Sequence, residues 1–415
     1  MASPELDRPI LSTGNGGIGG CVQYDDVEWA ASLGFAAVAT NNGHDGMTAV
    51  PFFQRPEVVT DFSFRAVETG VVVGKDVSKA FYGKPHTKSY YLGCSTGGRQ
   101  GMKMVAHFLP VTGSNTSDTF MSEDLWNVVH KDMLSQCDAL DGLADGILEA
   151  PDLCRYKADG LLCGNGSAPA DACLTSKQVN TVNTIFSDMR APNGIVLYPR
   201  MQPGSEAPGG FDSYYNGQPS DKSDWIKYVV LADPSFDMAQ FTPDLWALSD
   251  TLNPADIATT KADISAFRDR GGKLLHYHGI MDGVISSDNS PRYYERVRAA
   301  LGQAPAELDA FYRFFRVSGM GHCRGGPGAH YIGNQRRQLA FPDRPDQSVL
   351  MDMVHWVEQG VAPEFITGTA FVDDAQGGEV AFTRRHCRWP TMNKFMGGDS
   401  NSADSWSCVS YNATT

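Results

Sequence analysis

The sequence predicts an α/β fold, in which helices cover a parallel β-sheet and an inserted segment interrupts the chain. Short apolar runs typical of buried strands alternate with helical periodicity up to residue 107 and again from residue 273. The middle of the chain differs, because it is rich in Pro, Gly, Asp and Cys and has only short apolar segments. We therefore expect a discontinuous core domain of residues 1–117 and 263–415, with an inserted domain of residues 118–262.

Each expected element follows from its hydrophobic period and from the residues that end it. Four short apolar runs predict strands, at residues 35–40, 89–92, 273–278 and 312–317. Three further stretches predict helices, at residues 25–33, 97–107 and 347–358. Residues 62–82 are ambiguous, since Val71–Val73 favour a strand while the wider spacing and the closing Gly83 favour a helix; we interpret them as a helix.

The composition narrows the classes of partner. The chain has 415 residues, of which 42% are hydrophobic, and its 34 Lys+Arg and 48 Asp+Glu give a net charge of −14. An acidic chain attracts phosphate backbones and anionic membranes poorly, and no apolar run approaches the length of a membrane span. We therefore expect no nucleic-acid and no membrane partner.

Nine cysteines are present, which is an odd number for a protein with disulfides. Five of them lie in polar, Gly-rich stretches that we interpret as loops, where closely spaced cysteines favour disulfides over buried thiols: Cys154, Cys163, Cys173, Cys387 and Cys408. No spacing is that of a zinc site. The cysteines indicate an oxidising, secretory compartment.

Three sequons agree with a secreted glycoprotein, although such triplets also arise by chance: Asn115, Asn165 and Asn412. The chain opens Met-Ala-Ser-Pro-Glu, without the apolar core of a signal peptide. We expect a secreted protein whose signal peptide is not present in this chain.

The segment Gly93-Cys94-Ser95-Thr96-Gly97 matches G-x-S-x-G, with a predicted strand before it and a predicted helix after it. In that context the glycines permit a sharp turn that exposes Ser95 as a nucleophile. The backbone N–H of Thr96 could then stabilise an oxyanion at the helix N-terminus. The alternative is an ordinary Gly-rich turn between a strand and a helix.

A serine nucleophile needs a base and an orienting acid. His322 lies in a polar loop directly after the strand at 312–317, and Asp282 follows the strand at 273–278. The order Ser95, Asp282, His322 is that of α/β-hydrolases. Asp288 is the rival acid, but it lies farther from the strand end. We interpret the other histidines, including His276 and His278 on the strand, as structural or surface residues.

Cysteines flank two of these residues, since Cys94 precedes Ser95 and Cys323 follows His322. A disulfide between them would hold their Cα atoms about 5.5 Å apart and bring the serine beside the histidine. Two cysteines next to two independently chosen catalytic residues support the choice of both.

These motifs resemble the tannase/feruloyl esterase family. The resemblance is carried by GCSTGG and GMGHC with YHGxxD between them, and by GNGGIGGC, SLGFAAVATNNGHDG, AFYGKP and CDALDGLADGIL. It extends over most of the chain and is closer to fungal feruloyl esterases than to bacterial members, which include a mono(hydroxyethyl) terephthalate hydrolase. It implies an α/β-hydrolase fold with a lid domain that hydrolyses carboxylic esters.

The resemblance also implies a structural calcium ion in the lid. Its ligands would be the side chains of Asp138, Asp141 and Asp145 and the backbone carbonyls of Leu143 and Ile147. Carboxylates interleaved with glycines suit a hard cation, although the spacing is not that of an EF-hand and a solvated acidic turn is the alternative. For the oxyanion hole, the resemblance adds an N–H of Gly16 or Gly17 to that of Thr96.

The resemblance pairs eight of the cysteines: Cys94–Cys323, Cys137–Cys154, Cys163–Cys173 and Cys387–Cys408. Cys21 then lacks a partner, because the family's N-terminal segment before GNGG is missing. The resemblance also implies a strand after the nucleophile helix, and no matching segment follows His107, so we expect a truncated gene product.

Two classes of function follow. The first is a secreted serine esterase that cleaves esters of phenolic or aromatic acids, of plant cell-wall origin or as small molecules, through an acyl-enzyme. The second, motivated by the missing segments, is a catalytically impaired, calcium-binding protein for phenolic or carbohydrate ligands. A serine peptidase would share the triad. We expect a monomer or homodimer.

Overall fold

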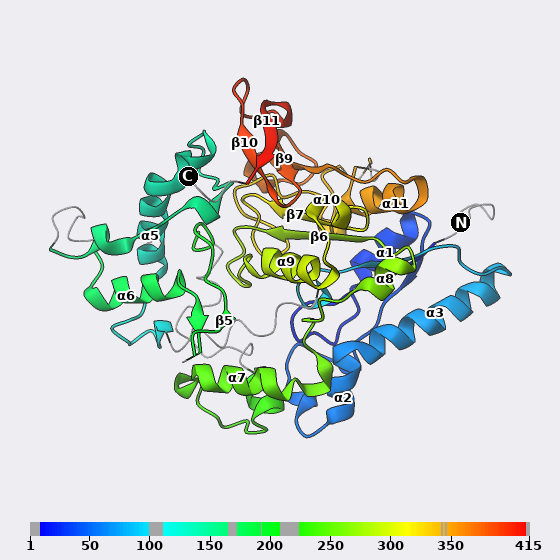
Figure 1. The fold of residues 1–415 in the computed structure, drawn as a ribbon. Helices are drawn as coiled ribbons and strands as arrows, with labels where there is room; N and C mark the ends of the chain where they lie inside the picture. Colours follow the sequence, from blue (N-terminus) through cyan, green and yellow to red (C-terminus); the bar gives the residue numbers. More distant parts are fainter. Residues whose placement is uncertain are drawn as a thin grey trace. The chain divides into compact units, whose positions relative to one another are not determined.

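The computed structural model describes residues 9–98, 111–164, 172–191, 193–207, 224–341, 343–344 and 347–411. It is a mixed structure of helices and strands (Figure 1), as the sequence predicts. The chain forms two compact units, each built from separate stretches of sequence. The first contains residues 1–107, 219–259 and 334–337, and the second contains the remainder.

The first unit contains a parallel three-stranded sheet. Its strand order is β2-β1-β3, with β1 at Ile10–Thr13, β2 at Ala36–Val38 and β3 at Ser89–Leu92. Helices α1 (Tyr24–Ser32) and α3 (Ala66–Tyr82) connect the strands. The βαβ arrangement follows from the sequence, because each helix ends at a glycine in the left-handed region that lets the chain turn back to the sheet.

The same unit has an aromatic cluster away from this sheet. Phe52, Phe62 and Trp225 pack together, with ring centroids of Phe52 and Phe62 4.9 Å apart. The elements here are short: α2 (Pro56–Thr60), a π-helical turn at Asp61–Arg65, a second at Trp225–Val230, and α7 (Pro243–Leu252).

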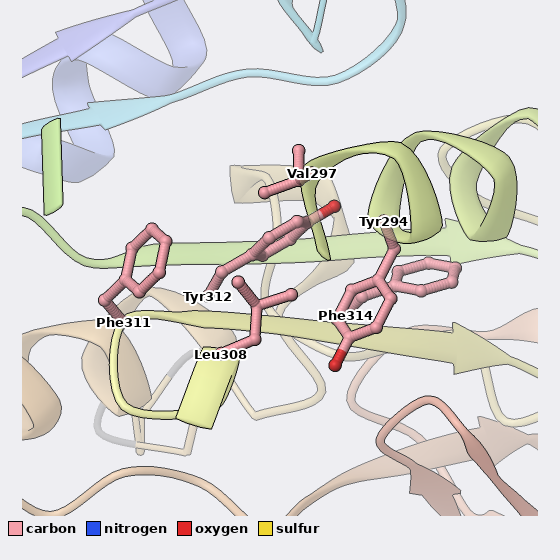
Figure 2. Close-up of a cluster of buried hydrophobic side chains, with 6 residues drawn as sticks. All are labelled: Tyr294, Val297, Leu308, Phe311, Tyr312 and Phe314. Carbon is pink, nitrogen blue, oxygen red and sulfur yellow. The ribbon is translucent and has the colours of Figure 1, made fainter. Parts of the chain in front are cut away.

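The second unit contains a parallel strand pair, β6 (Leu274–Gly279) and β7 (Tyr312–Val317). Its helices are α8 (Ser265–Asp269), α9 (Asn289–Leu301), α10 (Pro305–Leu308) and α11 (Val349–Gln359). Figure 2 shows the core between α9 and β7, where six buried side chains meet: Tyr294, Val297, Leu308, Phe311, Tyr312 and Phe314.

Two antiparallel strand pairs complete the C-terminal part: β8 (Phe365–Phe371) with β9 (Val380–Cys387), and β10 (Thr391–Phe395) with β11 (Trp406–Ser410). The placement of Cys387 and Cys408 in loops is therefore wrong, because both lie on strands. Their disulfide joins β9 to β11. The polar residues around both cysteines suggested loops, but these segments pair as strands of two hairpins.

The remaining part of this unit, residues 111–207, is irregular. It contains α5 (Glu123–Cys137), α6 (Ser176–Ile185) and the short pair β4 (Met189–Arg190) and β5 (Val196–Tyr198). Disulfides Cys137–Cys154 and Cys163–Cys173 close two of its loops, as the family resemblance implies.

Strands β3 and β7 have the predicted bounds, and the ambiguous stretch at 62–82 is helical, because α3 accommodates Val71–Val73 in a helix of 17 residues. The predicted helix 97–107 and the missing segment after it fall mostly at residues 99–110, outside the described residues. The division into a catalytic domain and a lid stays a prediction. No helix within the described ranges is long and apolar enough to cross a membrane.

We predict that Val297→Ala lowers the free energy of unfolding by about 1.5–3 kcal/mol, because each buried methylene-sized group contributes about 0.8 kcal/mol and a cavity remains. Val297 is fully buried in α9. The matched control is Val361→Ala in the same unit, where 62% of the residue is exposed. It should cost less than about 0.5 kcal/mol. Equal losses in urea unfolding would contradict the assigned core.

Candidate active site

Ser95 follows strand β3 in a sharp turn. Its φ is +58°, in the left-handed region that residues other than glycine rarely adopt. A 3-10 turn at Ser95–Gly98 continues the chain. Such a conformation typically costs about 1–3 kcal/mol and persists where the surroundings enforce it, commonly at functional sites. The local geometry is that of a serine held in a tight turn at the end of a strand.

The Gly-rich turn after β1 packs directly on this serine turn. The N–H of Gly14 donates to the carbonyl of Leu92 over 2.9 Å, and a Cβ on Gly14 would lie 2.7 Å from the Cα of Gly97. Only glycine allows this approach of two backbones. Gly16 and Gly17 follow in the same turn, so the predicted oxyanion donors lie on two adjacent turns of one unit. Their role, with that of Thr96, stays a prediction.

His322 and Asp282 lie together in the second unit. Nδ1 of His322 is 2.8 Å from Oδ2 of Asp282, at the ends of β7 and β6 respectively. A Cβ on Gly279 would lie 2.4 Å from the carbonyl oxygens of Met320 and Gly321. Glycine at this position therefore lets the loop that carries His322 pass in close contact with the end of β6.

Asp282 is buried and fully hydrogen-bonded. Its Oδ1 accepts from the N–H groups of Val284 and Ile285 at 2.8 and 2.9 Å, and its Oδ2 contacts His322 and Nε2 of His278, the latter at 3.2 Å. A carboxylate has about four lone-pair sites, and all four are used.

Burial alone would raise the pKa of Asp282, but the charge and hydrogen bonds of His322 and His278 hold the pKa well below its usual range. Asp282 is therefore ionised near neutral pH. The pKa of Asp282 is therefore lower in the folded protein than its value of about 3.9 in the unfolded chain. The ionised carboxylate contributes fully to stability above about pH 3.9, and this contribution is lost as the pH falls through the folded pKa.

The rival acid, Asp288, faces other groups. Its Oδ2 is 3.7 Å from Nε of Arg200, and burial raises the pKa of Asp288 to about 6. His322 therefore has Asp282, not Asp288, at its Nδ1.

Cys323 has a φ of +66°, so a strained residue also adjoins the histidine. Cys94 and Cys323 are both disulfide-bonded, and Cys21 is an exposed free cysteine. Ser95 lies in the first unit and His322 in the second. Each half of the predicted triad is built within its own unit, and the contact between serine and histidine stays a prediction.

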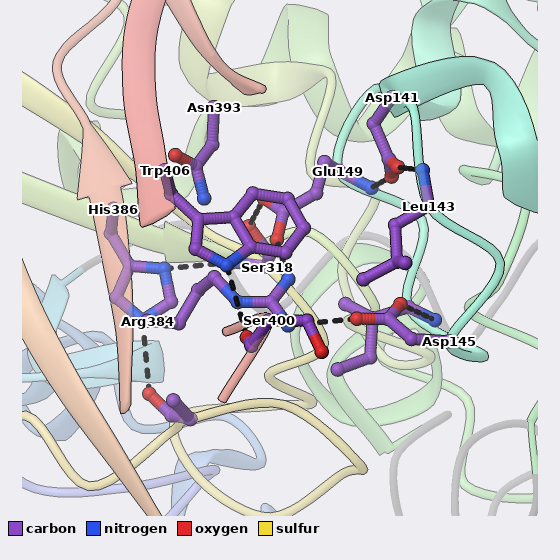
Figure 3. Close-up of polar contacts among 12 residues, drawn as sticks. Asp141, Leu143, Asp145, Glu149, Ser318, Arg384, His386, Asn393, Ser400 and Trp406 are labelled. Atoms are coloured by element: carbon purple, nitrogen blue, oxygen red, sulfur yellow. Dashed lines mark hydrogen bonds and ion pairs between the residues drawn. The ribbon is translucent and has the colours of Figure 1, made fainter. Parts of the chain in front are cut away.

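A buried ion-pair network holds the start of the histidine loop (Figure 3). The guanidinium of Arg384 on β9 binds Glu149 at 2.5 Å and Asp145 at 2.8 Å, and it lies 3.6 Å from the ring centre of Trp406. Glu149 in turn accepts a hydrogen bond from the hydroxyl of Ser318, four residues before His322.

The backbone of Ser318 has a second anchor. Its N–H donates to Nδ1 of His386 at 3.3 Å, while Nε2 of His386 lies 2.9 Å from the carbonyl of Ala329. Burial lowers the pKa of His386 to about 4, so the ring is neutral and can accept at Nδ1. Sequence reasoning missed both anchors, because it placed this segment in a loop and gave Arg384 and His386 no partner.

The predicted calcium ligands occupy the loop after α5. Here the carboxylates bind backbone N–H groups: Asp138 that of Gly146, Asp141 those of Leu143 and Glu149, and Asp145 that of Ile147. Across the residues that the structure describes, no group of three or more His, Cys, Asp or Glu side chains is arranged to hold a metal.

Two features of this loop nevertheless suit a cation. Oδ1 of Asp138 is buried without a hydrogen-bond partner, and burial, together with the charges of Glu149 and Asp145, raises the pKa of Asp141 to about 7. The loop therefore carries oxygen donors. Arg384 compensates the charge of Asp145 and Glu149, and no cation is paired with Asp138 or Asp141 among the described contacts.

The chain is similar to a known protein family and to named relatives. The family model described as "Tannase and feruloyl esterase" matches residues 3–110 and 108–409. A protein from Neosartorya fischeri named "Probable feruloyl esterase B-2" is 47% identical over 430 residues, which cover 96% of this chain and 81% of that protein.

Solved structures are similar as well. Feruloyl esterase B from Aspergillus oryzae has 45% identity and a TM-score of 0.90, covering 97% of this chain and 85% of its own. An esterase from the same organism has 47% identity and a TM-score of 0.91, and the match covers 97% of this chain and 84% of that esterase. A tannin acyl hydrolase from Aspergillus niger, at 22% identity and a TM-score of 0.75, shares the fold.

The fold and these matches define the chain as a carboxylic ester hydrolase. It belongs to the tannase and feruloyl esterase family, which confirms the resemblance read from the sequence motifs. The two parts of the family match meet at residues 108–110, where the sequence leads us to expect a missing segment.

We predict that Arg384→Met lowers the free energy of unfolding by about 3–5 kcal/mol, because it leaves two carboxylates without their buried cation. The neighbouring Arg385→Met is the control, since its partner Asp404 is 94% exposed and 3.5 Å away, and it should cost less than about 1 kcal/mol. The measurement is the urea midpoint of both variants. Similar midpoints would show that the network does not stabilise the fold.

Proposed function

We propose that this chain is a secreted esterase that hydrolyses phenolic acid esters of the feruloyl type on an α/β-hydrolase fold with a lid domain. The observation that carries the proposal is the buried Asp282–His322 pair, which has the geometry of an oriented general base. The strained Ser95 turn and the similarity to proteins named feruloyl esterase B support it. These features do not favour the alternative of a catalytically impaired binding protein.

In the proposed mechanism Nε2 of His322 takes the proton of Ser95 Oγ as the hydroxyl attacks the ester carbonyl. Asp282 stabilises the imidazolium that forms. The N–H groups of Thr96 and of Gly16 or Gly17 bind the oxyanion. His322 then protonates the leaving alcohol, and water releases the phenolic acid from the acyl-enzyme.

This mechanism needs the two units to meet at the serine and the histidine. A Cys94–Cys323 disulfide would join the residues adjacent to both and hold the general base near the nucleophile. Disulfides also suit an extracellular enzyme. The sequon at Asn115 is exposed and accessible to glycosylation, whereas those at Asn165 and Asn412 lie outside the described residues.

We predict that Ser95→Ala lowers kcat/KM for methyl ferulate by about a thousandfold or more, because the acyl-enzyme cannot form. The matched control is Ser135→Ala, an exposed serine on α5 whose hydroxyl binds only within its own helix turn. The control should keep wild-type turnover. Substantial activity of the Ser95→Ala variant would overturn the nucleophile assignment.

The proposal includes a structural calcium ion in the lid. Asp138, Asp141 and Asp145 would supply carboxylate oxygens and Leu143 and Ile147 carbonyl oxygens, and the ion would neutralise the loop without entering the reaction. The partnerless Oδ1 of Asp138 and the raised pKa of Asp141 support it.

We predict that free Ca²⁺ at about 100 times its Kd stabilises the protein by about 2.7 kcal/mol and that chelation lowers Tm by a few degrees. Asp138→Asn should abolish the response, whereas Asp269→Asn, at an exposed acid on α8, should retain it. The measurement is thermal unfolding with and without chelator. An unchanged Tm of the wild-type protein after chelation argues against the ion.

A further inference from the structure

A chain of buried polar groups continues from Asp282 on the side away from His322. Nε2 of His278 contacts Oδ2 of Asp282 at 3.2 Å, and Nδ1 of His278 is 2.7 Å from Oγ of Ser290. The same Oγ is 3.0 Å from Nε2 of His276, whose Nδ1 is 3.0 Å from the hydroxyl of Tyr312.

The proposal developed below places one proton on each imidazole ring of this row. Asp282 is ionised and can only accept, so Nε2 of His278 donates to it. With its proton at Nε2, His278 accepts at Nδ1 from the hydroxyl of Ser290, and Ser290 accepts from Nε2–H of His276. His276 finally accepts at Nδ1 from the phenol of Tyr312. In this arrangement the three middle groups, His278, Ser290 and His276, each donate once and accept once, so that every hydrogen bond of the row has its proton.

Burial keeps the far end of this row, Tyr312 and His276, uncharged. Tyr312 is fully buried within the apolar cluster of Figure 2, beside Tyr294 and Phe314. Burial raises the pKa of Tyr312 well above 10, so the phenol keeps its proton. Burial lowers the pKa of His276 to about 3, so that ring is uncharged. In low-dielectric surroundings each hydrogen bond is strengthened and an unmade one is costly.

The elements that carry the chain are rigid. His276 and His278 lie two residues apart on β6, so both side chains point to the same face of the strand. Ser290 lies in the first turn of α9, and Tyr312 begins β7, the parallel neighbour of β6. A polar row on this strand face is therefore enclosed by a helix and a second strand.

We propose that His278 is a positioning residue of the ester hydrolase: fixed in one tautomer by Ser290, His276 and Tyr312, it donates a permanent hydrogen bond that aims Asp282 at His322. This inference rests on the Ser95–His322–Asp282 mechanism proposed above. If His322 were the only histidine partner, Oδ2 of Asp282 would have an unused lone pair and the carboxylate could rotate. The second partner removes that freedom before substrate binds.

His278 also affects the charge balance of the pair. A donor on Asp282 draws electron density from the carboxylate, which makes the protonated form of His322 less favourable. Without this donor, His322 should stay protonated to a higher pH and be unable to act as base there. The titratable groups that face Asp282 and His278 come from four elements: His276 on β6, Tyr312 on β7, His322 after β7, and Tyr198 on β5.

The test is a set of variants of the whole protein assayed on methyl ferulate across pH. His278→Phe removes the donor and keeps a ring of similar size, whereas His278→Gln keeps an N–H that can reach Asp282. We expect His278→Phe to lower kcat by about 10–100-fold with KM changed less than about twofold, since misplacement by about 1 Å costs about a hundredfold. The acid limb of kcat/KM should move to higher pH, and His278→Gln should recover most of both.

Ser290→Ala interrupts this row of hydrogen bonds without changing a direct partner of Asp282. It is the second test if His278→Phe does not fold. It should move the acid limb in the same direction by a smaller amount. Unchanged kcat and acid limb in folded His278→Phe or, if that variant does not fold, in Ser290→Ala would overturn the inference. So would equal impairment of His278→Phe and His278→Gln. A wild-type protein inactive on phenolic esters, or an active Ser95→Ala variant, would instead refute the proposed function.

Discussion

The second unit is organised around one buried charge, the carboxylate of Asp282. Moving such a group out of water costs several kcal/mol unless nearby donors replace the lost hydration. Two backbone N–H groups and two histidines supply those donors. The backbone donors require the tight turn after β6, and the histidine donors require that β6 and the loop after β7 meet at one edge. Satisfying one carboxylate therefore constrains two strands and two loops together.

A second buried network supports the loop that carries His322. Arg384 binds Glu149, and Glu149 binds Ser318 at the start of that loop. Because Arg384 lies on β9, the antiparallel strands at the C-terminus contribute to the site without supplying any residue to the reaction.

The candidate triad residues stand out in the sequence because each follows a short apolar strand and has a glycine within two residues. Because those signals are local, the predicted bounds of β3 and β7 also match the observed bounds. His278 and Arg384 carry no such signal. Strand pairing and contacts between residues far apart in the sequence bring their partners to them. Period-2 alternation predicts only the face of a strand on which a polar residue lies, not the residue that it contacts. For this reason the sequence suggested structural or surface roles for the histidines of β6.

The two networks differ in how they meet the same physical demand. Arg384 neutralises buried carboxylates with a permanent charge, which stabilises the loop but fixes the charge state. In the proposed mechanism, the row from Tyr312 to His278 would orient Asp282 without cancelling the negative charge that stabilises an imidazolium at His322. A permanent cation at the place of His278 would compete with that imidazolium. A donor held in a single tautomer would instead hold the acid still and leave its charge available to the base.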